Sequence, residues 1–292
     1  MTGTCTGNFN ITKNLTLIGI GGAVLDGNHA GITVTVSPGV RAQLTSLTIT
    51  HGAGNNGFGG GGVLNNGTVT LTRSTVSDNT TTANGGGIYN NFGATATLTG
   101  STVSGNTAPL GFAGGIYNTF GDTVTLTDST VSGNTADEGG GGILNGSNGP
   151  TMVGLVVLNR SQVTNNTART EGGGILNVDG GAVRLTNSTV SGNTAQSVAG
   201  RGGGGIANEF DATLTLTGST VSGNTADVDG GGIYNLRATA TLNSSTVSGN
   251  TAHADGGGIF NDSGTVSLHR SQVLANTPDN CAPPGSVPGC TG

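Results

Sequence analysis

Charge and aromatic rings are scarce in this chain. It has no tryptophan, aromatic residues make up 3% of it, and charged residues make up 8%. Lys and Arg number 9 against 15 Asp and Glu, which gives a formal net charge of -6. Nucleic acid is therefore not expected as a partner, because its phosphates require a basic stripe, and neither is an anionic membrane surface.

Long apolar segments are also missing. The longest apolar run, residues 152–158, is about a third of the length that a membrane-spanning helix needs, so no membrane span is expected. Residues 1–7 lack the basic start and the apolar stretch of a signal peptide. We expect a secreted or cell-surface protein whose export signal has been removed, or a fragment of a longer chain.

Cysteine is rare, with 3 residues in the chain. Cys281 and Cys290 lie nine residues apart in a proline-rich tail, a spacing too irregular for a zinc knuckle and suited to one closed loop. They predict a disulfide, and the alternative is two free thiols. Cys5 is left over, and its partner would lie upstream of the sequence.

What the chain does contain is a repeat. A heptad of the form Ser-Thr/Gln-Val-Ser/Thr/Leu-x-Asn-Thr occurs eight times between Ser74 and Thr277, each copy close to a Gly-Gly-Ile/Val-x-Asn segment. Its serine recurs every 26 to 32 residues, at Ser74, Ser101, Ser129, Ser161, Ser188, Ser219, Ser245 and Ser271. A repeat of this period is typical of a solenoid or an array. Propeller blades are longer, and the calcium roll needs Gly-Gly-x-Gly-x-Asp where this chain has Gly-Gly-Gly-Ile-Tyr-Asn, so neither is expected.

Three apolar positions recur in every copy, and apolar and polar residues alternate around them with the period of a half-buried strand. A leucine lies three residues before each serine, a valine lies two after it, and the glycine segment adds an isoleucine or valine. The sets are Leu71, Leu98, Leu126, Leu158, Leu185, Leu216, Leu242 and Leu268; Val76, Val103, Val131, Val163, Val190, Val221, Val247 and Val273; and Val63, Ile88, Ile116, Ile143, Ile175, Ile206, Ile233 and Ile259. Three short strands that face one interior predict an all-β fold, a three-sided parallel β-helix or β-solenoid.

The same spacing continues upstream, where Leu44, Leu47 and Ile49 repeat it with a leucine in place of the serine, and the total is about ten coils. We expect one domain over residues 1–292, with the first coils in 1–50, eight repeat coils in 51–277 and a proline-rich C-terminal loop or cap in 278–292. The disulfide loop would cover the C-terminal end. The first coil has no capping helix before it, so it is protected by sequence further upstream or pairs with another molecule in end-to-end self-association.

These repeats resemble the right-handed β-helix proteins of the pectin-lyase-like superfamily. The motifs Gly-Gly-Gly-Ile-Tyr-Asn and Ser-Thr-Val-Ser-Gly-Asn-Thr-Ala are similar to those of bacterial exported repeat proteins, and the glycine segments are similar to the Gly-Gly-Ala-Ile repeats of polymorphic outer-membrane proteins. The resemblance covers about residues 10–277 and includes the first-coil segment 14–27. It implies the fold, but the superfamily includes polysaccharide lyases, glycoside hydrolases and adhesins, so it does not assign chemistry.

The loops before the glycine runs carry the densest cluster of ionisable groups. One residue per coil lies in register there: Asn84, Ala113, Glu138, Glu171, Arg201, Asp229 and Asp255. Acids on adjacent coils would lie roughly 5 Å apart, which suits a calcium ion or the carboxylate pair of a retaining glycosidase. A lyase-like site would instead use Arg201 near bound calcium. The alternative is a solvated edge on which Glu171 and Asp229 flank Arg201 as weak ion pairs.

A second row consists of the residue between each inward isoleucine or valine and the following asparagine. Its aromatic members, Tyr89, Tyr117, Tyr234 and Phe260, would stack on sugar rings or on a partner if they are exposed. The alternative is that the following loops, with Phe92, Phe120 and Phe210, fold over this row and bury it. The sequence is compatible with both arrangements.

Two further rows are polar. Threonine pairs such as Thr97 and Thr99 flank the buried leucines, as in β-solenoid ice-binding proteins, but other coils have Val157 or Arg184 there. Threonine is also a common strand residue on a wet sheet. The asparagines of both motifs recur in every copy and are predicted to stack amide on amide at the corners.

The first hypothesis for function is a non-enzymatic, adhesin-like rod, extracellular or on the cell surface, that binds polysaccharide or neighbouring surface proteins. The alternative is a polysaccharide lyase or glycoside hydrolase that acts at the acidic edge of Glu138, Glu171, Arg201, Asp229 and Asp255. Ice binding through the threonine rows is a lower alternative. No cofactor is expected other than a calcium ion at the acidic edge.

Overall fold

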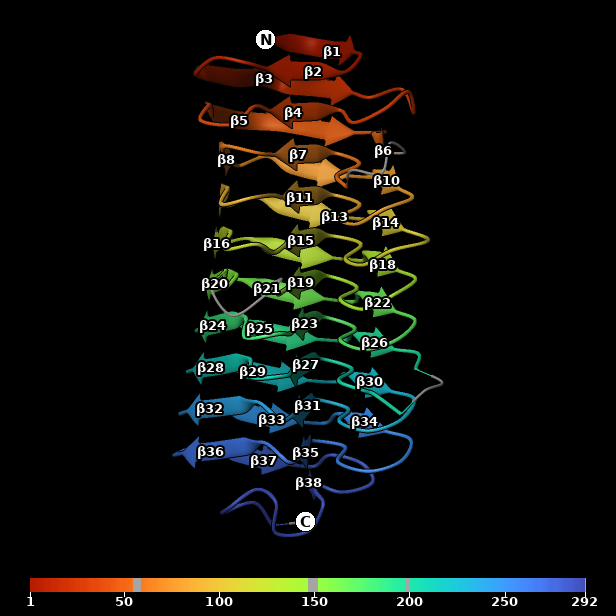
Figure 1. Cartoon of the computed structure of the whole chain (residues 1–292), viewed down its shortest axis with the longest axis vertical. Coiled ribbons are helices and arrows are strands. Elements are labelled where there is room, and N and C mark those ends of the chain that lie inside the picture. Colours follow the sequence, from red (N-terminus) through yellow and green to blue (C-terminus); the bar gives the residue numbers. More distant parts are fainter. Residues whose placement is uncertain (55–58, 147–151, 198–199, 292) are drawn as a thin grey trace.

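The structure is a computed structural model, and it describes residues 1–54, 59–146, 152–197 and 200–291. The chain winds into an elongated rod with the N-terminus at one end and the C-terminus at the other (Figure 1). Parallel strands make up its regular structure, and the described residues contain no helix. The predicted all-β, parallel β-solenoid is confirmed.

Sheet I contains the strands of the glycine segments, where an isoleucine or valine begins most strands. Each strand pairs in parallel with its copy one coil away, as Tyr117 does with Leu144. The part of the chain that the structure describes contributes these strands to sheet I: β2 (Phe9–Ile11), β4 (Val34–Val36), β7 (Val63–Asn65), β11 (Ile88–Asn90), β15 (Ile116–Asn118), β19 (Ile143–Asn145), β23 (Ile175–Asn177), β27 (Ile206–Glu209), β31 (Ile233–Leu236), β35 (Ile259–Asp262) and β38 (Cys281–Ala282).

Sheet II contains the leucine strand and the valine strand of each coil. Among the described residues its strands are β1 (Thr2–Thr6), β3 (Leu15–Asp26), β5 (Arg41–Thr50), β8 (Thr68–Thr72), β9 (Thr75–Ser77), β12 (Thr95–Thr99), β13 (Thr102–Ser104), β16 (Thr123–Thr127), β17 (Thr130–Ser132), β20 (Leu155–Asn159), β21 (Gln162–Thr164), β24 (Ala182–Thr186), β25 (Thr189–Ser191), β28 (Thr213–Thr217), β29 (Thr220–Ser222), β32 (Thr239–Asn243), β33 (Thr246–Ser248), β36 (Thr265–His269) and β37 (Gln272–Leu274).

Sheet III is formed by two-residue strands, which from β10 onward follow the heptad asparagine. Its strands within the described residues are β6 (Ala53–Gly54), β10 (Thr80–Thr81), β14 (Thr107–Ala108), β18 (Thr135–Ala136), β22 (Thr167–Ala168), β26 (Thr194–Ala195), β30 (Thr225–Ala226) and β34 (Thr251–Ala252). The sequence did not predict these strands, because two residues are too short to display an alternating pattern.

The three sides of the rod therefore differ from the prediction in one respect. The leucine and valine strands were expected on separate sides, but they belong to one bent sheet. The bend lies just before the heptad serine, where Arg73, Asp128 and Arg160 have φ of 47°, 51° and 48°. This left-handed conformation interrupts the strand and turns it, and the Thr-Ala pairs of sheet III form the remaining side.

The predicted inward positions are confirmed. Leu126, Val131 and Ile143 are each 0% exposed, and their copies before the last coil are at most 1% exposed. In the last coil Leu268 and Val273 are only partly buried, because they lie at the end of the rod. A further buried row lies two residues before each leucine, at Val69, Ala96, Val124, Val156, Val183, Leu214, Ala240 and Val266.

The glycine runs are required by the close approach of neighbouring coils. A Cβ atom added at Gly86 would lie 2.5 Å from the carbonyl oxygen of Gly114 in the next coil. Real Cβ atoms do not approach backbone oxygen so closely, so any larger residue would force the coils apart. The glycine run therefore recurs from coil to coil because neighbouring coils pack closely there, and not because it binds a ligand.

Polar side chains stack along the corners, as predicted for asparagine. Asn106 Nδ2 donates to Asn134 Oδ1 at 2.9 Å, and Asn118 Nδ2 donates to Asn145 Oδ1 at 2.8 Å. The heptad serines form a third ladder, in which the backbone N–H of Ser101 donates to Ser129 Oγ at 3.1 Å. These side chains are almost fully buried, and their hydrogen bonds satisfy backbone groups at the bends.

The two ends of the rod differ. At the C-terminal end a disulfide joins Cys281 and Cys290, with 6.3 Å between their Cα atoms, and Val287 of the same loop packs on the core. At the N-terminal end β1 pairs with β3, and a hollow of about 370 Å³ remains beside β2, lined mainly by Asn8, Phe9, Asn10, Ile11, Thr12, Lys13, Leu15, Leu17 and Leu25. Cys5 is exposed as a free thiol.

Candidate functional site

The outer face of sheet I carries the predicted aromatic row. Tyr89 and Tyr117 stack with ring centroids 4.9 Å apart, and Tyr234 stacks on Phe260 at 5.6 Å. Between these two stacks the row continues with Leu144, Leu176 and Ala207, which are buried. The row is thus an apolar strip with an aromatic pair toward each end.

Two alternatives were predicted for this row, exposure to a partner or burial by the loops, and each is partly correct. Tyr234 is only 4% exposed, whereas Tyr89, Tyr117 and Phe260 are half-buried. The loop that carries Phe92 does not cover the row, because Phe92 is 71% exposed and stacks on Phe120 at 5.0 Å. The middle of the strip is covered, because Leu144, Leu176 and Ala207 are at most 5% exposed and pack with Phe112 and Val178.

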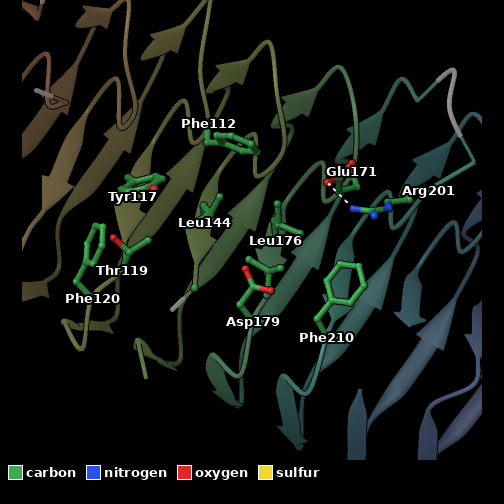
Figure 2. Close-up of a pocket in the computed structure, with 12 residues that line it drawn as sticks. Phe112, Tyr117, Thr119, Phe120, Leu144, Glu171, Leu176, Asp179, Arg201 and Phe210 are labelled. Atoms are coloured by element: carbon green, nitrogen blue, oxygen red, sulfur yellow. Dashed lines mark ion pairs between the residues drawn. The ribbon is translucent and has the colours of Figure 1, made fainter. Parts of the chain in front are cut away.

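This arrangement forms a groove of about 360 Å³ on the outer face of sheet I (Figure 2). Its floor consists of Tyr117, Leu144 and Leu176 from β15, β19 and β23. One wall comes from the loops before these strands and before β27, and the other wall comes from the turns after the same four strands. The wall residues are Phe112, Glu171 and Arg201 on the first side and Thr119, Phe120, Gly146, Val178, Asp179 and Phe210 on the second.

The turn after each asparagine aims the aromatic side chains of the second wall. Phe120 and Phe210 have φ of 57° and 53°, in the left-handed region. A bulky residue is uncommon there, and such backbone strain tends to occur at functional sites. The backbone N–H of Phe210 donates to the carbonyl of Leu236 at 2.9 Å, which fixes the turn against the next coil.

The predicted acidic edge divides into two parts. Glu171 and Arg201 line the groove, whereas Glu138, Asp229 and Asp255 do not. The backbone N–H of Asp255 donates to the carboxylate of Asp229 at 3.0 Å, so this pair is engaged within the edge itself. The expected flanking of Arg201 by Glu171 and Asp229 is half right, because the second carboxylate beside Arg201 belongs to a different residue.

That residue is Glu209, at the end of β27. Arg201 Nη1 lies 3.7 Å from Glu171 Oε1 and 3.4 Å from Glu209 Oε2 (Figure 2 marks the first contact). The guanidinium also lies over the ring of Phe210, 5.1 Å from its centroid. Sequence reasoning missed Glu209, although the positions after the asparagines of sheet I in the preceding coils are uncharged, and a charge there is a departure from the other copies.

Burial perturbs both carboxylates. The pKa of Glu209 is raised to about 7, chiefly by burial and also by the negative charges of Glu171 and Asp179, while Arg201 opposes the shift. Burial also raises the pKa of Glu171, and Arg201 opposes that shift too. Glu209 is 0% exposed, and its Oε1 has no hydrogen-bond partner within the described structure.

No group of three or more His, Cys, Asp or Glu side chains in the described ranges is arranged to hold a metal ion. Calcium at the acidic edge therefore remains a prediction. The threonine row of sheet II is interrupted as the sequence indicated, because Thr125 pairs with Val157, which in turn pairs with Arg184. This interruption weighs against a flat ice-binding face.

Two known protein families match parts of this chain. Residues 4–198 match the family described as the right handed beta helix region. Residues 218–236 and 244–262 match the Chlamydia polymorphic membrane protein repeat. No curated protein and no solved structure matches the chain. Among the described residues, no helix is both long and apolar enough to cross a membrane.

Proposed function

The chain belongs to the right-handed β-helix family, and from this premise we propose that it is a non-enzymatic, adhesin-like surface rod that binds glycan in the groove on sheet I. The match to a polymorphic membrane protein repeat supports a secreted or cell-surface location. Stacked coils support each wall by backbone hydrogen bonds, so the groove is rigid before a ligand arrives, and this lowers the entropic cost of binding.

The aromatic and polar composition of the groove is the observation that carries this proposal. Ligand sites are commonly concave and mainly apolar, with a few polar groups that fix orientation. Here Tyr117, Phe112 and Phe120 offer ring faces, and Glu171, Asp179 and Arg201 offer hydrogen-bonding groups. A sugar chain has apolar ring faces and hydroxyl edges that match both kinds of group.

Binding of neutral, acidic and amino polysaccharide fragments, measured by calorimetry, tests the proposal. We expect at least one class to bind, and Phe112→Ala to weaken that binding about tenfold, the loss of roughly 1.4 kcal/mol of ring contact. Leu110→Ala is the matched control, because Leu110 lies in the same loop, is 70% exposed and does not line the groove. Absence of binding to every class would overturn the proposal.

A polysaccharide lyase or glycoside hydrolase is the second candidate. It is favoured by the contact of Glu171 and Glu209 with one arginine, because carboxylates with raised pKa values act as general acids. The complete burial of Glu209 opposes it, since a catalytic acid must reach the substrate. Incubation with the same polysaccharides, with and without calcium, distinguishes the two: the rod yields no product, and an enzyme yields product that Glu171→Gln abolishes.

A further inference from the structure

The groove on sheet I follows the axis of the rod. Its lining residues come from four successive coils, those of β15, β19, β23 and β27. Phe120 and Phe210 lie at its two ends on the same wall, with Asp179 between them (Figure 2). A ligand that occupies the length of the groove therefore crosses the coils one after another, and does not follow a single strand.

The coils repeat at a fixed step that their outward side chains preserve. Neighbouring strands of a sheet lie about 4.8 Å apart, so three coil steps separate Phe120 from Phe210 by about 14 Å. The ring pairs Tyr89–Tyr117 and Phe92–Phe120, whose members are one coil apart, stack at 4.9 and 5.0 Å. The groove thus presents one set of contacts per coil, at intervals of about 5 Å.

A polymer must advance by the same step to use these contacts in succession. Pyranose sugars joined by equatorial β-1,4 bonds form a nearly straight chain, and each sugar advances the chain by about one coil of this rod. The axial bond of an α-1,4-linked glucan instead turns the chain into a wide helix, which leaves the line of the groove after a few sugars. A stiff, straight chain also loses less conformational freedom when it is bound.

The charges along the groove disfavour an acidic sugar chain. Of the ionisable side chains that line it, Glu171 and Asp179 are acidic and Arg201 is basic. Arg201 Nη1 lies 3.7 Å from Glu171 Oε1 and 3.4 Å from Glu209 Oε2, so its charge is already shared between two carboxylates. Asp179 is exposed and takes part in no ion pair within the described residues. Its carboxylate would repel a uronic acid, but it accepts hydrogen bonds from uncharged hydroxyl groups.

We propose that the groove binds a neutral, extended, β-1,4-linked glycan that lies along the rod axis with one sugar on each of four coils. This inference rests on the proposed glycan-binding function and names the ligand class of the same groove. The sugar on the β15 coil packs on the rings of Phe112, Tyr117 and Phe120, which are half-buried. The sugar on the β23 coil contacts the methyl groups of Val178 and donates a hydroxyl hydrogen bond to Asp179. Each of these side chains lines the groove and is partly or fully exposed, so the sugars reach them from solvent.

Calorimetric titration of the whole chain with oligosaccharides of graded length tests the proposal. The β-1,4-linked probes are cello-, xylo- and N-acetylated chito-oligosaccharides. Malto-oligosaccharides are the α-1,4-linked counterpart of the first series, and galacturonic acid oligomers are the charged one. We expect at least one β-1,4-linked series to bind about tenfold more tightly than the malto-oligosaccharide of equal length. Its affinity should rise up to the tetrasaccharide and then level off, because the groove spans four coils.

Phe120→Asn tests the contact at the first coil. Phe120 has a φ of 57°, and asparagine tolerates this left-handed backbone, so the change removes the ring and keeps the turn. The tetrasaccharide should bind several-fold more weakly, and its advantage over the trisaccharide should shrink. Phe92→Asn is the matched control, because Phe92 has a φ of 51° at the same place in the preceding coil and does not line the groove. It should leave both affinities unchanged.

The remaining outcomes separate this inference from the function on which it rests. Malto-oligosaccharides that bind as tightly as every β-1,4-linked series, or affinity that keeps rising beyond the tetrasaccharide, would overturn the match between sugar and coil and leave glycan binding standing. An equal loss in Phe92→Asn and Phe120→Asn would do the same. Tighter binding of galacturonic acid oligomers than of any neutral series would overturn the neutral ligand in favour of an anion site at Arg201. Binding of no oligosaccharide at all would overturn both proposals.

Discussion

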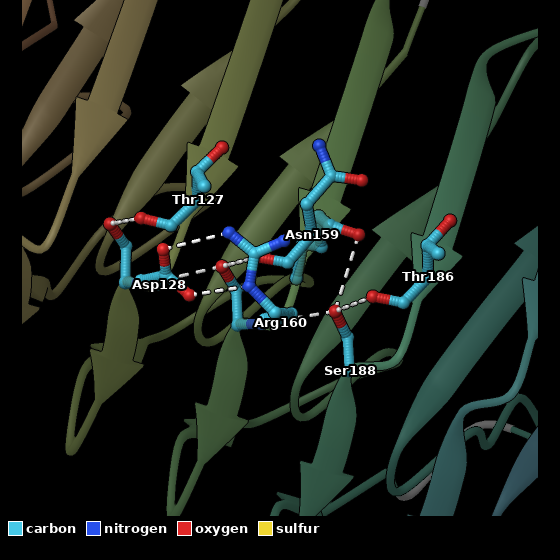
Figure 3. A network of polar contacts seen from close by, with 9 residues as sticks. Thr127, Asp128, Asn159, Arg160, Thr186 and Ser188 are labelled. Atoms are coloured by element: carbon cyan, nitrogen blue, oxygen red, sulfur yellow. Dashed lines mark hydrogen bonds and ion pairs between the residues drawn. The ribbon is translucent and has the colours of Figure 1, made fainter.

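Two arginines of this rod hold carboxylates in opposite ways. On the corner of sheet II, Arg160 donates from Nε and Nη2 to the two oxygens of Asp128 at 2.8 and 2.9 Å (Figure 3). Both side chains are more than half exposed. In the groove on sheet I, Arg201 reaches two largely buried carboxylates through longer contacts and satisfies neither of them fully.

The difference shows that close geometry and energetic importance are separate properties. The corner pair has ideal bidentate geometry, but water solvates both partners when they separate. Formation of the pair therefore adds little to the free energy of unfolding. The groove pair has poor geometry, but the low-dielectric surroundings of Glu209 make any change in its charge or partners expensive. Function is therefore expected where contacts are loose and buried rather than where they are short and exposed.

The largest effect should come from titration of Glu209. Its pKa is raised from the ordinary 4.5 to about 7 in the folded protein, so the folded state holds this proton more tightly than the unfolded chain does. Its stabilising contribution is complete below about pH 4.5 and is lost as the pH rises to about 7. The free energy of urea unfolding should fall by about 3 kcal/mol more across this window in the native chain than in Glu209→Gln.

The difference between the two curves isolates Glu209. Asp122 is also buried, and its pKa is raised to about 6. It therefore lowers the free energy of unfolding with rising pH in the native chain and in Glu209→Gln alike. Parallel curves for the native chain and Glu209→Gln would contradict the prediction. They would mean that the Glu209 carboxylate has an ordinary pKa and that the two arginine sites do not differ in kind.

Arg201→Ala should have the next largest effect. Above the pKa of Glu209 it leaves a buried carboxylate without its cation, and we expect a loss of about 2 kcal/mol in the free energy of unfolding. The loss is limited because Glu209 can take up a proton instead. It should shrink at acidic pH, where Glu209 is already neutral. An equal loss at both pH values would indicate that Arg201 contributes through its packing on Phe210 rather than through its charge.

The fold was predictable because every coil repeats the same packing problem. Leu126, Val131 and Ile143 and their copies are buried together when short parallel strands stack coil on coil. The bend at Asp128 and the two-residue strands of sheet III were not predictable. They depend on single left-handed residues and on an alanine whose burial is fixed by neighbouring coils.

The groove was only partly predictable. Glu171, Arg201 and Tyr117 were singled out because they depart from their copies or form a row, and they line it. Glu138, Asp229 and Asp255 belong to the same edge but lie outside the groove, because differing loop lengths keep the edge from converging. Glu209 was missed because its contact with Arg201 depends on how the loop before β27 folds back beside the end of that strand.

The corner pair should give the smallest effect. Arg160→Gln and Asp128→Asn, alone and together, should leave the midpoint of urea unfolding unchanged, and the coupling between the two changes should be too small to measure, because both groups are solvated in either state. Glycan binding should also be unaffected, since neither residue lines the groove. A loss as large as that of Arg201→Ala would break the comparison, because it would place the exposed, short contact among the interactions that hold neighbouring coils together.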